Sequence, residues 1–289
     1  MPMKLFSIAG CTRCQMVKRY LDEAGLDYQE HDAMGSGAEA FRAFYKQNRP
    51  RIFRGPEGVE FPLLADDEGI YQGLGMAVAR LKHGKALAGF FRPGLLHGQW
   101  VDGIDVSGGD PRQGEAFLEV LAELKAANFR LEAHSDGRNA ELLEQVLERD
   151  LIQRLVMELR APLRCYEAIT GQALSSEEMA KSLSLAPRFP EYLFYTVVAP
   201  IRRGKEDPPR YDYLTPQEIG EIAALIKEAT GDKTHPYLLK PFDPTKARNK
   251  KLRRFEAMTP SRLFKYRSAA RRHLVKTEIQ KNFDAGCDL

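Results

Sequence analysis

The sequence predicts an α/β protein of two domains, the second of which is an incomplete parallel (β/α) barrel of about six strands. Three observations support this prediction. A strand pattern gives way to a helical pattern at Cys11-Thr-Arg-Cys14, residues 3–80 continue to alternate between the two patterns, and strand-then-helix units repeat from Trp100 onward. The 289 residues, 43% of them hydrophobic, are enough to form two hydrophobic cores.

The first domain is expected to have the order strand, helix, strand, helix, two strands and a final helix. Its strand patterns lie at 4–9, 27–32, 59–65 and 69–73, and its helical patterns lie at 15–24, 38–48 and 74–83. The last two strands are joined by the acidic turn Asp66-Asp67-Glu68, which is typical of a tight connection.

The second domain is expected to alternate strictly between strands and helices. Its candidate strands are 103–106, 130–134, 155–159, 193–198, 237–241 and 274–279, and its candidate helices are 114–127, 140–148, 176–185, 216–229 and 260–272. Six strands are too few for a closed eight-stranded barrel, so we expect an open, partial TIM barrel. We place the first domain at 1–84, a linker containing Gly89, Pro93 and Gly98 at 85–99, and the second domain at 100–289.

The composition favours a cytoplasmic protein without a membrane anchor. No apolar run reaches the length of a membrane span, and the N-terminus has no basic-then-apolar leader. The four cysteines, Cys11, Cys14, Cys165 and Cys287, are too few for a disulfide framework and fit a reducing compartment.

The net charge of +3 conceals a basic segment at residues 246–276. This segment has twelve Lys or Arg residues and one acidic residue, Glu256, and the rest of the chain carries a net charge of −8. A basic segment can attract nucleic acid or an acidic partner. Because no aromatic platform or zinc finger accompanies the charge, we favour a solvated helix face, and nucleic acid is not the expected partner. The sequence does not predict the oligomeric state.

The strongest chemical signal is the pair Cys11 and Cys14 at the predicted turn from strand to helix. The free amides at a helix N-terminus favour a thiolate, and Arg13 between the cysteines adds a positive charge. The same spacing is half of many metal sites, but no second pair follows it, so we favour disulfide exchange over zinc. Inert thiols in a vestigial domain are the alternative.

The first domain resembles the glutaredoxins, which have a thioredoxin-like fold. The resemblance rests on Cys11-x-x-Cys14 after the first strand, Phe61-Pro62 before the third and Gly73 after the fourth. It implies that Cys11 is the exposed nucleophile, that Cys14 is the resolving thiol, and that the bond before Pro62 is cis and packs against the disulfide. The substrate-binding residues that it implies are Arg13, Phe61, Pro62 and Gly73.

Three positions depart from the glutaredoxin pattern. Thr12 stands where proline is common, and Glu60 stands where threonine is frequent, which would place a negative charge beside the glutathione groove. After Gly73, the run Leu74-Gly75-Met76 lacks the Gly-x-Asp arrangement that caps the carboxylate of the tripeptide. Glutathione is therefore only a candidate co-substrate. Dithiol exchange is still expected, because it does not depend on these positions.

The second domain resembles the radical S-adenosylmethionine activating enzymes. Residues 102–111 resemble their Gly-Gly-Glu-Pro motif, with Asp110 in place of glutamate, and residues 134–137, 157–162 and 195–200 parallel three further strand-end motifs in the same order. In that family the Gly-Gly edge holds the methionyl ammonium group of the cofactor.

The cluster motif of that family, Cys-x3-Cys-x2-Cys, is absent from the sequence. A 4Fe–4S cluster with one open iron needs three thiolates, so no cluster is expected. In one alternative, Cys11 and Cys14 are the last two ligands and Ser7 is a poor first one. S-adenosylmethionine is a weak candidate ligand of the second domain, because the cluster motif is absent. No metal site is expected.

A ligand site at the carboxyl edge of the parallel sheet is the remaining candidate in the second domain. We expect it to be formed by Ser107, Gly108, Gly109, Asp110, His134, Asp136, Glu158 and Arg160, with Thr196 and Arg202 close by. The alternative is a structural remnant that positions the first domain.

The sequence therefore predicts a glutaredoxin-like thiol–disulfide oxidoreductase whose substrate is a protein or small-molecule disulfide. The barrel would confer ligand or partner specificity. A non-catalytic ligand-binding or sensor module is the second hypothesis, and an iron–sulfur radical enzyme of the activase type is the third.

Overall fold

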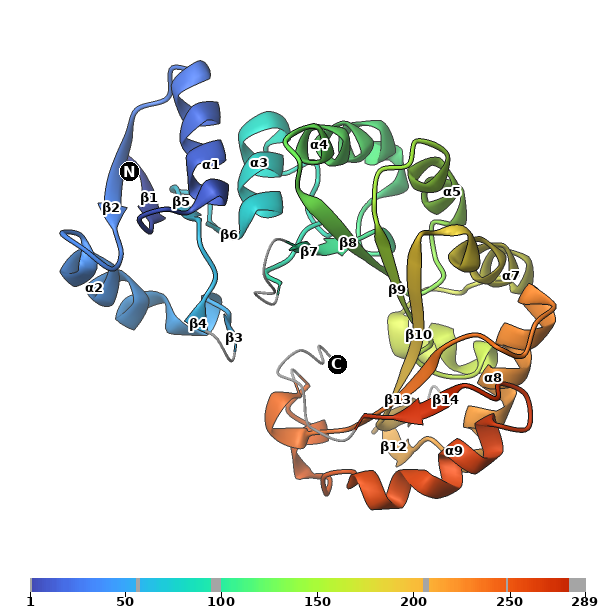
Figure 1. Ribbon diagram of the computed structural model, residues 1–289. Helices are drawn as coiled ribbons and strands as arrows, with labels where there is room; N and C mark the ends of the chain where they lie inside the picture. The colour runs from blue at the N-terminus through green and yellow to red at the C-terminus, as the bar shows by residue number, and fades with distance from the viewer. Residues whose placement is uncertain (1, 56–57, 95–99, 205–207, 248, 281–289) are drawn as a thin grey trace. The chain divides into compact units, whose positions relative to one another are not determined.

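The computed structural model describes residues 2–55, 58–94, 100–204, 208–247 and 249–280 (Figure 1). The chain divides by packing into two compact units, residues 1–133 and 134–289, and each unit is described by itself. The predicted domain bounds at residues 84 and 99 stay predictions, because a division by packing does not test them.

The first unit begins with a mixed four-stranded sheet of the order β2-β1-β5-β6. Strand β1 (Met3–Ser7) is parallel to β2 (Tyr28–Asp32) and antiparallel to β5 (Leu63–Ala65), which pairs with β6 (Ile70–Gln72). The helices are α1 (Thr12–Glu23), α2 (Ala38–Asn48) and α3 (Leu74–His83). This order of elements is the predicted one. A short hairpin, β3 (Arg54–Gly55) with β4 (Gly58–Val59), was not predicted.

The core of this sheet also holds the second cysteine. In α1, Cys14, Val17 and Leu21 are spaced by three and four residues, so they lie on one face, and all three are buried. Helix α1 packs on α3. Figure 1 shows α2 on the opposite side of the sheet, where Phe41 and Phe44 contact the ring of Phe6.

Part of the predicted linker packs into the first unit. Leu87, Phe90 and Phe91 are buried, and Phe91 forms a bridge to Ile104. The chain continues through β7 (Trp100–Asp105) and α4 (Gly114–Ala126), while residues 95–99 of the predicted linker lie outside the described residues. The segment after α3 therefore contributes apolar side chains to a core.

The second sheet has six strands in the order β14-β13-β10-β9-β8-β7. The strands after β7 are β8 (Arg130–Ser135), β9 (Arg154–Glu158), β10 (Glu191–Val198), β13 (Tyr237–Pro241) and β14 (Thr277–Ile279). The pairs β9–β10, β10–β13 and β13–β14 are parallel. The predicted α/β sheet of six strands is confirmed, and its open strand order is consistent with an incomplete barrel.

In the second unit, α5 (Ala140–Glu148), α7 (Ser176–Leu185), α8 (Pro216–Thr230) and α9 (Phe264–Ala270) pack side by side in chain order. Figure 1 shows α5, α7 and α8 on one side of β9 and β10. The helix predicted at 260–272 begins as a 3-10 turn over Pro260–Leu263, so α9 is shorter than predicted.

Two elements of the second unit were not predicted. They are the short helix α6 (Tyr166–Thr170) and the hairpin of β11 (Pro200–Arg203) with β12 (Arg210–Tyr213). Arginine and tyrosine side chains dominate the hairpin, so its strands lack the alternation of apolar and polar residues that indicates a half-buried strand. Among the described residues, no helix is both long and apolar enough to cross a membrane.

Candidate active site

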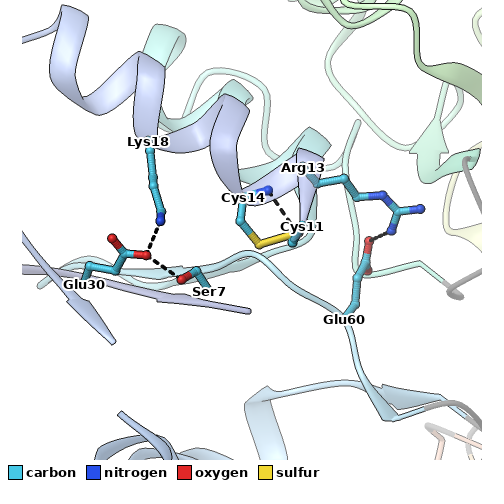
Figure 2. Close-up of a disulfide and its surroundings, with 7 residues drawn as sticks. All are labelled: Ser7, Cys11, Arg13, Cys14, Lys18, Glu30 and Glu60. Atoms are coloured by element: carbon cyan, nitrogen blue, oxygen red, sulfur yellow. Dashed lines mark hydrogen bonds and ion pairs between the residues drawn. A yellow bond between two sulfur atoms is a disulfide. The ribbon is translucent and has the colours of Figure 1, made fainter. Parts of the chain in front are cut away.

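Cys11 and Cys14 lie in the first turn of α1 and form a disulfide (Figure 2). Their Cα atoms are 5.3 Å apart. Cys11 is the N-cap residue, and its Sγ accepts a hydrogen bond of 3.1 Å from the amide of Cys14. Cys14 is 1% exposed, whereas Cys11 is only partly buried. The two sulfurs therefore differ in their accessibility, and Cys11 is the one that a second molecule can reach.

The local sequence explains this turn. Gly10 has a φ of 74°, a conformation that favours glycine, and it turns the chain from β1 into α1. The amide of Cys11 then donates to the carbonyl of Ile8, and the amide of Gln15 donates to the carbonyl of Cys11 to begin the helix. The amides of the first helical turn have no partners within the helix, so they are free to stabilise a negative charge on Cys11.

The segment between β4 and β5 packs next to the disulfide. The Phe61–Pro62 bond is cis, as the resemblance implies, and Phe61 belongs to the same buried cluster as Cys14. The amide of Gly73 donates to the carbonyl of Pro62 over 2.8 Å, which brings the start of α3 beside this segment. The structure therefore places Phe61, Pro62 and Gly73 together near the cysteines.

Arg13 is turned to the side of the disulfide where Glu60 lies, as Figure 2 shows. One of its nitrogens, Nη1, is 3.8 Å from Oε1 of Glu60, and the other, Nη2, donates to the carbonyl of Trp100 over 2.7 Å. Arg13 is buried, and Glu60 is only 5% exposed. The guanidinium is thus engaged with groups of its own chain.

Glu60 is not the fixed negative charge that the sequence predicts at this position. Its burial raises its pKa to about 8, and the negative charge of the buried Asp102 acts in the same direction. The amide of Gly94, which donates to Oε2 of Glu60 over 3.1 Å, and the charge of Arg13 oppose this shift. Glu60 is therefore mostly protonated at neutral pH.

A second carboxyl group lies on the other side of the disulfide and behaves differently (Figure 2). Glu30 accepts a hydrogen bond of 2.6 Å from Ser7 and forms an ion pair with Lys18. Burial acts to raise the pKa of Glu30, but the hydrogen bonds from Lys18 and Ser7 and the charge of Lys18 outweigh it and lower the pKa. Glu30 is therefore ionised at neutral pH.

The residues of the predicted ligand site are divided between the two units. Ser107, Gly108, Gly109 and Asp110 follow β7 in the first unit, where Asp110 caps a short turn and pairs with Arg112. A Cβ atom on Gly108 would lie 2.4 Å from the carbonyl of Gly89, and one on Gly109 would meet the ring of Phe90. The close approach that these glycines permit is therefore to their own chain.

The other members of the predicted site lie in the second unit, and three of them are brought together. Arg160 is 3.6 Å from Asp136 and 3.4 Å from Glu158. Arg138 also pairs with Asp136, over 2.7 Å. His134 is half-buried at the end of β8. The carboxyl ends of β8 and β9 therefore carry a network of alternating charges.

A cavity of about 370 Å³ lies next to this network, within the second unit. Glu158 and Arg160 line it, together with Arg202, and its remaining walls are largely apolar. The sequence analysis missed Tyr211 and Asn249 of the lining, because they belong to β12 and to the loop after β13, neither of which gave a pattern. A cavity of this size is typical of sites for small molecules.

The described residues do not provide the ligands of an iron–sulfur cluster. Cys11 and Cys14 are joined to each other, Cys165 stands apart in the second unit, and Cys287 lies outside the described residues. Ser7, the first ligand of the alternative set, donates its hydroxyl hydrogen to Glu30. Within the described ranges, no three His, Cys, Asp or Glu side chains are grouped so as to hold a metal ion.

Comparison with known proteins identifies the first part of the chain. Residues 3–57 match the family model named Glutaredoxin, a range that includes both cysteines but ends before Pro62 and Gly73. No curated protein matches the chain. The chain therefore begins with a glutaredoxin domain, and this domain supports a function like that of a thiol–disulfide oxidoreductase.

Replacing Glu60 by glutamine is expected to remove a pH dependence of stability. In the wild type the pKa of Glu60 is about 8 when folded and about 4.5 when unfolded, so the folded state binds more protons between these values. The free energy of unfolding should fall as the pH rises through this window, by at most about 1.4 kcal/mol per pH unit. Urea unfolding, followed by the fluorescence of Trp100, the single tryptophan, measures the effect in the first unit.

Glu30→Gln is the matched control for this experiment. Because the pKa of Glu30 is lowered in the folded state, its stabilising contribution is lost only as the pH falls toward that lowered value, and the variant should keep the wild-type slope above neutral pH. An equal slope in the wild type and in Glu60→Gln would contradict the assignment of the proton to Glu60.

Proposed function

We propose that the protein is a thiol–disulfide oxidoreductase in which Cys11 is the nucleophile and Cys14 is the resolving thiol. The observation that carries the proposal is the asymmetry of the pair: the accessible Cys11 sulfur accepts the amide hydrogen of Cys14, and the Cys14 sulfur is buried one helical turn further on. A thiolate at Cys11 is stabilised by this amide and by the helix N-terminus, so more of Cys11 is present as the reactive thiolate and its sulfur is a better leaving group.

The reaction proceeds in two exchange steps. In the first, the Cys11 thiolate attacks one sulfur of a substrate disulfide, the substrate S–S bond breaks, and the other substrate sulfur leaves as a thiolate. In the second, Cys14 loses its proton to a departing thiolate and attacks Cys11, which releases the remaining substrate sulfur. Two electrons pass to the substrate, and the Cys11–Cys14 disulfide is left to be reduced by a donor thiol.

The role proposed for the second part of the chain is to confer ligand or partner specificity. Its support is the order of the strand-end motifs, which resembles that of the radical S-adenosylmethionine activating enzymes, together with the parallel sheet of six strands. Since the described residues offer no three-thiolate set, no step of the proposed reaction runs through a cluster. We also propose a cytoplasmic location, because the cysteine usage fits a reducing compartment.

A ligand-binding or sensor function is the second candidate, and the cavity in the second unit is the observation that favours it. Two guanidinium groups, Arg160 and Arg202, and one carboxylate, Glu158, line the cavity among apolar side chains. This lining suits a small molecule that has an anionic group on an apolar body.

Cys11→Ser is expected to abolish turnover. The reduction of insulin by dithiothreitol should fall to the uncatalysed rate, because serine does not form the nucleophilic thiolate.

Cys14→Ser should still attack a disulfide and remain trapped as a mixed disulfide at Cys11, which mass spectrometry detects. The control is Cys165→Ser, which removes the free cysteine that the structure describes in the second unit and should leave the rate unchanged. Undiminished turnover in Cys11→Ser would refute the proposed function.

The cavity is expected to bind the dye anilinonaphthalene sulfonate, which has an anionic group on an apolar body. Fluorescence titration should show saturable binding that weakens about tenfold or more in Ala168→Trp, since Ala168 lines the cavity from α6 and the larger ring would fill it. Ala180→Trp, a half-buried position in α7 outside the lining, is the matched control. Absence of saturable binding, or equal weakening in both variants, would dismiss the ligand site.

A further inference from the structure

The anion-binding groups around the disulfide are engaged with the protein's own chain. Three such groups are described there: the N-terminus of α3, the guanidinium of Arg13 and the ammonium group of Lys18. Glutathione carries two carboxylates, so a site that holds it needs groups of this kind. Whether these groups are already paired within the chain decides which thiols can bind beside the disulfide.

The carboxyl group of Glu60 occupies the space beside the N-terminus of α3. A helix N-terminus attracts anions, and Gly73 stands directly before α3. A Cβ atom at Gly73 would lie 2.7 Å from Oε1 of Glu60, so the carboxyl group of Glu60 packs directly on this glycine. Two residues further on, the ring of Phe91 covers Gly75, where a Cβ atom would lie 2.7 Å from the ring. Glu60 and Phe91 therefore occupy the space beside both glycines at this end of α3.

The segment after α3 holds Glu60 in this position. The amide of Gly94 donates to Glu60, and the main-chain carbonyl of Trp100 accepts from Arg13. Arg13 is buried between that carbonyl and Glu60, so its guanidinium faces its own chain. Segment 90–94 and the start of β7 therefore hold both groups from the same side.

Lys18, on the other side of the disulfide, is engaged with Glu30. Glu30 also accepts from Ser7 and stays ionised at neutral pH, so the charge of Lys18 is balanced within the protein. The two carboxylates of a glutathionyl group at Cys11 would therefore meet cations, Arg13 and Lys18, that already have carboxyl partners within the chain. Desolvating these carboxylates without a counter-charge is unfavourable.

We propose that the Cys11–Cys14 couple rejects glutathione and exchanges electrons with dithiols, because Glu60 and segment 90–94 occupy the surface that a tripeptide thiol needs. This inference rests on the proposed function. A dithiol needs no such surface, since its second thiol attacks the mixed disulfide intramolecularly at a high effective concentration.

The dithiol step balances without a further reagent. One thiolate of the donor attacks Cys11, the Cys11–Cys14 bond breaks, and Cys14 leaves as a thiolate that takes up a proton. The second donor thiol then loses its proton and attacks the donor sulfur that is bound to Cys11. The bond between that sulfur and Cys11 breaks, and Cys11 leaves as the second thiolate. The donor becomes a disulfide, and both cysteines are reduced by two electrons in total.

The test compares two donors on the whole 289-residue chain. With glutathione, glutathione reductase and hydroxyethyl disulfide, turnover should stay within about twofold of the uncatalysed rate, whereas insulin reduction by dithiothreitol should exceed its own background about tenfold or more and require Cys11. Comparable catalysis with glutathione would overturn the inference and leave the proposed function standing. No catalysis with either donor would overturn both.

A pair of variants tests the reason for the rejection. Glu60→Ser removes the group that fills the N-terminus of α3 and frees Arg13 of its carboxylate, so the glutathione rate should rise about fivefold or more. Glu60→Gln keeps the shape of the side chain, so its glutathione rate should stay near background. The glutathione rate of Glu30→Ser, on the other side of the disulfide, should also stay near background. Trp100 fluorescence checks that each variant is folded. A rate that stays at background in a folded Glu60→Ser, or that rises equally in Glu60→Gln, would show that Glu60 does not exclude glutathione.

Discussion

The hydrogen bond from the Cys14 amide to the Cys11 sulfur is the interaction on which the chemistry proposed for this protein depends. It exists because Cys11 caps α1, and Cys11 caps α1 because Gly10 turns the chain at the end of β1. The same helical turn places the second sulfur in the core beside Phe61. One local constraint therefore fixes an accessible sulfur, the amide that donates to it and a buried second sulfur.

The buried carboxyl group of Glu60 is the second constraint, and it acts over a longer range. A carboxyl group this deep is unfavourable when charged, and the structure lowers that cost by protonation, by the amide of Gly94 and by Arg13. Two of the groups involved, Gly94 and Asp102, come from the segment that leads into β7. The first turn of α1 is thereby tied to a strand of the parallel sheet through Arg13 and the carbonyl of Trp100.

Local features of this fold could be predicted from the sequence, and long-range ones could not. Helices α2, α3, α5 and α7 have the predicted bounds, because their apolar spacing is a property of the segment itself. The strand-to-helix placement of Cys11 and Cys14 follows from the same local patterns. Nothing in those patterns shows that Arg13 turns to Glu60 and Trp100, since that pairing depends on how distant segments pack.

The residues of the predicted ligand site differ in how far their surroundings follow from the strand ends. Gly108 and Gly109 permit close approach, but the sequence does not say what approaches, and in the structure Gly89 and Phe90 of the same chain do. Asp136, Glu158 and Arg160 do meet, because their strands are parallel and end at one edge. Tyr211 lines the cavity from β12, and the hairpin that contains β12 was not predicted because its charged strands give no apolar pattern.

Strand β7 and the residues before it have two structural tasks that constrain each other. As a strand, β7 forms one edge of the parallel sheet, and the carbonyl of its first residue, Trp100, accepts a hydrogen bond from Arg13 of α1. The preceding residues Phe91 and Gly94 cover Gly75 and hold Glu60. Within the first unit, these residues therefore belong both to the surroundings of the disulfide and to the segment that leads into β7. This shared segment is the physical link between the glutaredoxin domain and β7.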